Sequence, residues 1–133
     1  MATEENKAAL VDAFDAAWNA HDEDAIMDWF TEEAVVSISP SPPGHPDTYH
    51  GKEQIRGWVR STLTGFHVES RSHGEVGDTV TSDVTVVMDS LPIESADAMV
   101  ATVFEGRKVR AMRAVFTPET LAKMRSAMEN AEN

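Results

Sequence analysis

The side chains that could carry chemistry in this chain are carboxylates, imidazoles and a single phenol. The 133 residues include 23 acidic side chains, 5 histidines and 1 tyrosine, but no cysteine. The lack of cysteine excludes thiolate nucleophiles, disulfides and Cys-based metal sites. The phenol and one imidazole are adjacent, as Tyr49 and His50, where a helical pattern begins. Such a pair could offer a phenol and an imidazole to a polar group of a substrate, although a surface loop would place both residues in water.

The other histidines lack the spacing of a metal site. His67 and His73 are expected on one face of a strand, but they would lie about 20 Å apart at the usual rise per residue. His45 belongs to a proline-rich segment, in which no rigid element would hold ligands. His21 is expected at a turn between two helices, where a structural role is typical. We therefore expect no metal site and no cofactor.

The charge and the hydropathy of the chain exclude two classes of partner. The net charge is −12, so nucleic acids and anionic membrane surfaces are repelled overall. No stretch approaches the roughly 18 apolar residues of a membrane span. The length suits one domain, and we find no repeat or linker. We expect a single cytoplasmic domain, residues 1–133, that binds neither nucleic acid nor membrane.

Apolar residues recur at spacings of three and four in several segments, which predicts helices. The first helix covers about residues 4–20, and Asp22 is the expected N-cap of a short second helix. A third helix begins near Gly51, and the last follows Thr117, with a proline at its first position. Five acidic residues between positions 15 and 33 are expected on outer helix faces and at caps, where they have no chemical role: Asp15, Asp24, Asp28, Glu32 and Glu33.

Alternation of apolar and polar residues predicts an antiparallel set of strands. The expected strands cover residues 34–39, 66–73, 80–89, 96–104 and 108–116. The last two pair as a hairpin across 105–107, whereas 39–46 is a proline-rich loop and 74–78 a turn. One face of the sheet is expected to be core, and the other is expected to be wet or to form an interface.

Four segments give the chain a resemblance to a known superfamily: 17–22 (AWNAHD), 29–34 (WFTEEA), 49–51 (YHG) and 112–116 (MRAVF). Together with the order of the elements, they resemble the nuclear transport factor 2-like superfamily, especially its SnoaL-like polyketide cyclase and ketosteroid isomerase branches. The resemblance covers nearly the whole chain. It implies an α+β fold in which a bent antiparallel sheet is wrapped by helices into a cone around an apolar pocket, the cystatin-like α+β roll.

The ketosteroid isomerases allow a comparison residue by residue, because their catalytic groups have counterparts here. Those enzymes use an Asp base and an oxyanion hole of Tyr and protonated Asp. The resemblance puts the Tyr on Phe14, the base on Ile38 and the second Asp on Met99. All three polar groups are replaced, so we expect no ketosteroid isomerase activity. The same match implies a pocket lined by Phe14, Trp18, Ile38, Trp58, Met99, Met112 and Phe116.

The resemblance leaves two kinds of function open. The first is an isomerase or cyclase in which a carboxylate in an apolar cavity moves a proton next to a carbonyl group. The second is a non-catalytic module that holds a small lipophilic, polyketide-like or steroid-like molecule, or that serves as a dimeric scaffold. Limonene epoxide hydrolases, a further branch, need an Asp-Arg-Asp set that has no clear match on the expected inward faces. A titratable side chain in the cavity would discriminate the first two.

If the protein is an enzyme, Asp97 is the acid/base that the resemblance indicates. Asp97 shares strand parity with Met99, which the resemblance places on the pocket wall. An acid among so many apolar groups would have a raised pKa, and it could exchange a proton with Tyr49 or His50 across the pocket mouth. The alternative is that residues 91–97 form a turn and Asp97 lies in water.

A homodimer is the assembly that the resemblance implies, since related proteins commonly pair through the outer face of the sheet. That face is expected to be mixed in character, with His67, Arg71, Thr81, Asp83 and Thr85.

Overall fold

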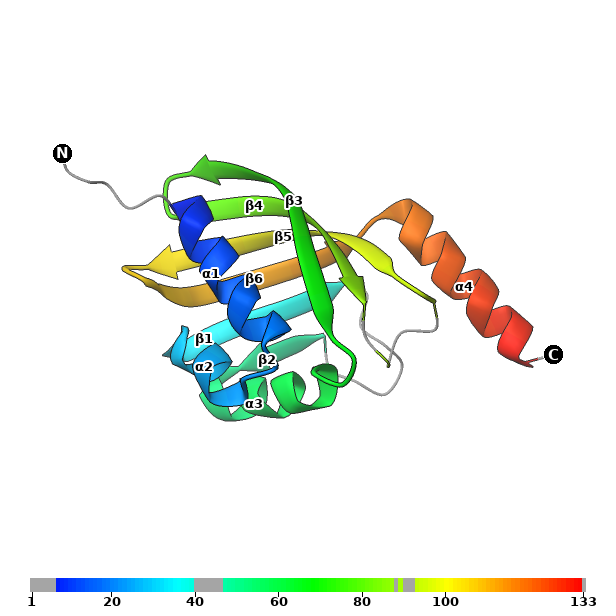
Figure 1. Ribbon diagram of the computed structural model, residues 1–133, viewed down its shortest axis with the longest axis horizontal. Coiled ribbons are helices and arrows are strands. Elements are labelled where there is room, and N and C mark those ends of the chain that lie inside the picture. Colours follow the sequence, from blue (N-terminus) through cyan, green and yellow to red (C-terminus); the bar gives the residue numbers. More distant parts are fainter. Residues whose placement is uncertain (1–6, 40–46, 88, 90–92, 133) are drawn as a thin grey trace.

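The fold is seen in a computed structural model that describes residues 7–39, 47–87, 89 and 93–132 (Figure 1). The helices are α1 (Lys7–Asn19), α2 (Glu23–Asp28), α3 (Gly51–Thr62) and α4 (Pro118–Glu132). The strands are β1 (Phe30–Ser39), β2 (Thr48–His50), β3 (His67–Val76), β4 (Thr79–Val87), β5 (Ala96–Glu105) and β6 (Lys108–Phe116). The α+β class predicted from the sequence is therefore confirmed.

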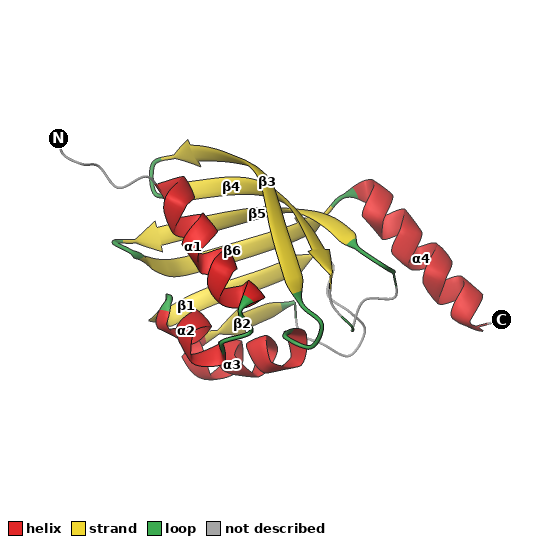
Figure 2. Cartoon of the chain, in the orientation of Figure 1, coloured by secondary structure: helices red, strands yellow, loops and turns green. Residues whose placement is uncertain are grey.

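The strands form one bent, open sheet (Figure 2). Its order is β2-β1-β6-β5-β4-β3, and the β1–β6 pair is parallel whereas the other pairs are antiparallel. Helix α1 packs on β3 and β4, while α3 packs on β1 and β2, so both helices cover the same concave face. Helix α4 leaves the end of β6 and extends away from the sheet (Figure 1).

The predicted hairpin between the last two strands is confirmed. Glu105 is paired with Lys108, and Gly106 between them has φ +64°. That region is open to glycine at little cost, which suits a tight connection between antiparallel strands. The hairpin aligns Thr102 with Met112 and thereby fixes which side chains of β5 and β6 face the helices.

Two polar side chains lock the end of α1 against the edge strand β3. The Asn19 side chain donates to the Val68 carbonyl at 2.9 Å and accepts from the Val68 N–H at 2.8 Å. His21, with φ +58°, donates from Nε2 to the Phe66 carbonyl at 2.6 Å. The predicted structural role of His21 is confirmed. The chain then enters α2 through Asp22, whose carboxylate accepts from the Ala25 N–H at 3.1 Å.

A bulge in β3 overturns the prediction that His67 and His73 share a face. The pairing register with β4 shifts between Ser70 and Ser72. An extra residue in one strand reverses the alternation beyond it. His67 therefore remains on the outer face, whereas His73 lies on the inner face opposite Ser82.

The main differences from the predicted elements are two strand boundaries and one additional strand. Strand β1 begins at Phe30, four residues before the expected start at 34, because it continues directly from α2. The short strand β2 was not predicted, and it pairs with β1 from Val35 to Ser37. Strand β3 continues to Val76, so the turn is confined to Gly77 and Asp78. Of the expected loop over 39–46, Ser39 belongs to β1, and residues 40–46 lie outside the described residues.

Candidate functional site

The concave face of the sheet is closed at one end and less covered at the other. At the end where β1 and β6 begin, Phe30, Phe104 and Val109 are at most 1% exposed. At the end where those strands finish, Ile38 and Phe116 are only partly buried. The short Ala96 and Ala98 side chains at this second end are buried. The larger apolar groups there are thus the ones that keep accessible surface.

Partly buried side chains lie at this second end and in the middle of the face, where Val100 is paired with Ser82 and Met112 with Thr102, and most of them are aliphatic or aromatic. We call them the open-end residues: Ile38, Tyr49, Trp58, Leu63, Val86, Val100, Met112 and Phe116. They come from five strands (β1, β2, β4, β5 and β6), from α3 and from the α3 C-cap, and all pack against the buried core. Apolar side chains on the concave side of a sheet are a common lining of small-molecule sites.

A chain of aromatic rings connects this end to the core. Phe14 and Trp18 of α1 are in edge contact, with ring centroids 6.2 Å apart. Trp18 contacts Trp58 of α3 at 5.2 Å, and Trp58 stacks on Tyr49 of β2 at 5.8 Å with an interplanar angle of 30°. Phe14 and Trp18 are 3% and 4% exposed, so they form the buried support and not the accessible surface.

Tyr49 points to the concave side, because it is paired with Val36, a fully buried residue of β1. Partial burial raises the pKa of the Tyr49 phenol above its ordinary value. Its hydroxyl has no hydrogen-bond partner among the described residues. Since no fully buried side-chain oxygen or nitrogen in that part of the chain lacks a partner, this hydroxyl retains accessible surface.

His50 does not accompany Tyr49. It is paired with Val35, one position further along, and its side chain is exposed. Its backbone N–H donates to Gln54 Oε1 at 2.9 Å at the start of α3. The structure therefore assigns His50 a place at a helix start, on the other side of β2 from the Tyr49 ring.

Asp97 lies on the outer face, and the prediction that its pKa is raised is wrong. Thr85 donates to the Asp97 carboxylate at 2.8 Å, and Arg71 approaches it at 3.2 Å. The Thr85 hydrogen bond and the Arg71 charge lower the pKa of Asp97, and its side chain is 47% exposed. The structure thus does not bring Asp97 together with Tyr49 and His50.

Met99 is likewise misplaced by the prediction, since its side chain is 52% exposed on the outer face. The parity shared by Asp97 and Met99 was correct, but the face was wrong. Ala96, Ala98, Thr102 and Phe104 are the residues of β5 that are buried toward the helices. Of the predicted pocket residues, Phe14 and Trp18 lie in the core, and four belong to the open end: Ile38, Trp58, Met112 and Phe116.

A second group of polar residues, which the sequence did not reveal, lies between α1 and β3. His73 Nε2 donates to the Asp12 carboxylate at 2.9 Å, and its Nδ1 lies 2.6 Å from Ser82 Oγ. Ser70 donates to Asp15 at 2.5 Å. Burial raises the pKa of Asp15, so the expectation that Asp15 is a solvated outer-face acid is wrong. No sequence signal marked the β3 bulge that turns His73 inward.

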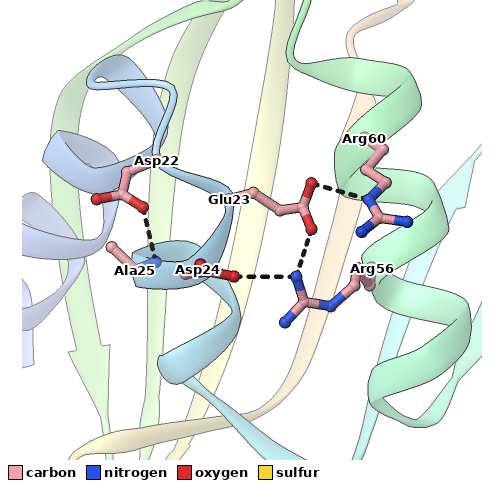
Figure 3. Close-up of polar contacts among 6 residues, drawn as sticks. All are labelled: Asp22, Glu23, Asp24, Ala25, Arg56 and Arg60. Carbon is pink, nitrogen blue, oxygen red and sulfur yellow. Dashed lines mark hydrogen bonds and ion pairs between the residues drawn. The ribbon is translucent and has the colours of Figure 1, made fainter.

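Ionic contacts hold α3, which carries Trp58, against α2 (Figure 3). Glu23 accepts from Arg60 at 2.9 Å and also binds Arg56, which contacts Asp24 at 3.1 Å. The Arg60 and Arg56 hydrogen bonds lower the pKa of Glu23. These contacts are largely exposed and set orientation more than stability.

The described residues contain no group of three or more His, Cys, Asp or Glu side chains arranged to hold a metal ion. Within the same part of the chain, none of the helices has the length and apolar character needed to cross a membrane.

Known proteins resemble the chain both in sequence and in fold. A model of the SnoaL-like domain matches residues 11–112. No curated protein matches the sequence. An NTF2-like protein of unknown function from Cytophaga hutchinsonii is 17% identical over 92% of this chain and 99% of its own, with a TM-score of 0.71.

Two further solved structures share the fold. A putative isomerase from Bacillus subtilis is 13% identical, covers 90% of this chain and 92% of its own, and has a TM-score of 0.72. A protein from Catenulispora acidiphila with a ketosteroid isomerase-like fold was crystallised in complex with trimethylamine. It is 19% identical over 84% of this chain and 87% of its own, with a TM-score of 0.68.

Proposed function

The chain belongs to the SnoaL-like domain family, and from this premise we propose that it binds a small lipophilic molecule at the open end of the concave face. The observation that carries the proposal is the partial burial of the open-end residues, which contrasts with complete burial at the opposite end. Covering such side chains with a ligand would remove apolar surface from water, which is worth roughly 25 cal/mol per Å².

Binding without catalysis is the version that the side chains favour. Proton transfer would need a carboxylate or an imidazole beside the ligand. The strand positions that face the helices near this end contain one ionisable group, the Tyr49 phenol; the others are Ile38, Val84, Val86, Ala96, Ala98, Ala114 and Phe116. Asp97 lies on the outer face and His50 on the other side of β2, so neither supports the enzyme hypothesis.

The comparison structure with trimethylamine supports the general idea that this fold can accommodate a small organic molecule. An aromatic pair such as Tyr49 and Trp58 can also attract a cation through the faces of its rings. An amine is therefore a useful competitor in the experiments that follow, because it separates apolar binding from cation binding.

The test is a titration with N-phenyl-1-naphthylamine, an uncharged fluorophore whose emission increases in apolar surroundings. We expect saturable binding to the folded protein and strong loss of binding in Met112→Asp, which puts a carboxylate at the open end. Arg113→Asp is the matched control, because Arg113 is the next residue and is exposed on the outer face. Equal affinity in both variants, with both folded by circular dichroism, would contradict the proposal.

If Met112→Asp does not fold, the test uses the milder variant Trp58→Ala, which removes one aromatic side chain of the proposed site. A matched Trp29→Ala substitution affects a ring that contacts Phe14 near the closed end. We expect weaker binding in Trp58→Ala alone. Equal weakening in both tryptophan variants would count against the open end as the site.

A homodimer through the outer face is a second part of the proposal, together with a cytoplasmic location. Met99 and Val115 are directly paired on β5 and β6, and they are 52% and 40% exposed. Exposed apolar side chains in adjacent strands favour an interface. Met99→Glu should convert the dimer into a monomer by light scattering, whereas a wild-type protein of monomeric mass at tens of micromolar would refute this part.

A further inference from the structure

The polar atoms of the open-end side chains indicate which ligand chemistry this site would select, provided that the proposed binding function is correct. Its eight side chains contain two polar atoms, the Tyr49 hydroxyl and the Trp58 indole N–H. Both can donate a hydrogen bond. Neither has a protein acceptor among the residues that the structure describes. An apolar surface with two free donors calls for a ligand that carries an acceptor.

The strand positions that face the helices near this end, such as Ile38, Val86 and Phe116, are apolar, so no strand residue there could balance a charge on the ligand. The indole does not ionise, and burial raises the pKa of Tyr49, so the phenol stays protonated at neutral pH. Desolvating an ion without a partner is costly. A ligand carboxylate would be desolvated without a cation, and an ammonium group could not accept a hydrogen bond from either donor. An uncharged acceptor such as a carbonyl oxygen is therefore favoured.

The donors are held in place before a ligand arrives. The backbone of Tyr49 is fixed by the pairing of β2 with Val36, and its ring stacks on Trp58. Trp58 in turn contacts Trp18, which is 4% exposed and part of the core. A donor that is already oriented loses little conformational entropy on binding, so its hydrogen bond contributes more to affinity.

We propose that Tyr49 is the residue that determines ligand specificity, and that it donates a hydrogen bond to the oxygen acceptor of an uncharged, otherwise apolar ligand. This role differs from the proton transfer considered from the sequence. It requires the phenol to remain protonated, and it needs neither His50 nor Asp97.

Two nearly isosteric probes isolate the proposed hydrogen bond. 2-Acetylnaphthalene carries a carbonyl oxygen where 2-isopropenylnaphthalene carries a CH₂ group. Wild-type protein should bind the ketone about tenfold more tightly than the alkene, the usual value of one hydrogen bond in a desolvated site. Tyr49→Phe should remove this preference and leave alkene affinity nearly unchanged, because it deletes the hydroxyl alone.

Tyr49 is the single tyrosine of the chain, so labelling tyrosine with ¹³C at Cζ gives one NMR signal that reports on this phenol. The signal should move on addition of the ketone and much less on addition of the alkene. It should also titrate above the ordinary tyrosine range near pH 10. This readout does not depend on any variant being folded.

Different failures have different meanings. Equal loss of both probes in Tyr49→Phe, or no loss of either, would overturn the role of the hydroxyl while leaving the binding function in place. Failure of wild-type protein to bind either probe or N-phenyl-1-naphthylamine would overturn the binding function itself. Tighter binding of trimethyl(2-naphthyl)ammonium than of the ketone would overturn the preference for an uncharged ligand.

Discussion

Asn19 joins the end of α1 to the edge strand β3, so its replacement tests how the helix that carries Phe14 and Trp18 is held over the sheet. The side chain makes two hydrogen bonds with the backbone of Val68, at 2.8 and 2.9 Å. Asn19→Ala removes both and leaves a backbone donor and acceptor without their partner. At roughly 1 kcal/mol for each bond, we expect about 2 kcal/mol of lost stability.

For a domain of this size that loss corresponds to a decrease in Tm of roughly 6–10 °C. The assay is thermal and urea unfolding followed by circular dichroism, together with amide hydrogen exchange, in which the Val68 N–H should exchange faster. Asn19→Asp is the matched variant, since it keeps one acceptor oxygen but replaces the NH₂ donor. A change below about 0.5 kcal/mol in Asn19→Ala, the range of neutral surface substitutions, would refute this account.

Three further substitutions test other contacts. Asp15→Asn should stabilise the protein at pH 7 by roughly 1 kcal/mol, because burial raises the pKa of Asp15 and wild-type stability is lost as pH rises through the folded pKa. A difference in Tm between variant and wild type that does not grow from about pH 4 to 7 would contradict this. Asp97→Asn should lower Tm slightly at neutral pH, since the folded pKa of Asp97 is lowered and its contribution to stability disappears as pH falls through that pKa. A Tm difference between wild type and variant that widens in acid would be the opposite result. Gly65→Ala should destabilise by about 1–2 kcal/mol, since Gly65 has φ +68° and a Cβ would collide with Asp89; unchanged urea unfolding would show that the turn adjusts freely.

Local sequence patterns were sufficient for most elements of the fold. The Thr117-Pro118 cap was predicted from residue type, and Thr117 Oγ1 does accept from the Thr120 N–H at 3.2 Å. The hairpin of β5 and β6 followed from alternation around a glycine. These features depend on residues close in sequence, for which propensity and turn chemistry are informative.

The errors arose where long-range pairing decides the outcome. Strand parity groups Asp97 with Met99 but does not tell which of the two faces meets the helices. A family resemblance supplied that choice, and it selected the wrong face for both residues. The β3 bulge, which brings His73 to Asp12, has no local signature either. Only the Tyr49 member of the predicted catalytic group lies at the open end.

The central claim, that the open end binds a small uncharged lipophilic molecule, is tested most directly by intermolecular NOEs. The measurement uses protein in which the tyrosine ring and the methionine methyl groups are isotopically labelled, in complex with unlabelled N-phenyl-1-naphthylamine. We predict NOEs from the ligand to the Tyr49 ring and the Met112 methyl group, which both belong to the open end. NOEs to the Met99 methyl group on the outer face, without any to Tyr49 or Met112, would contradict the claim.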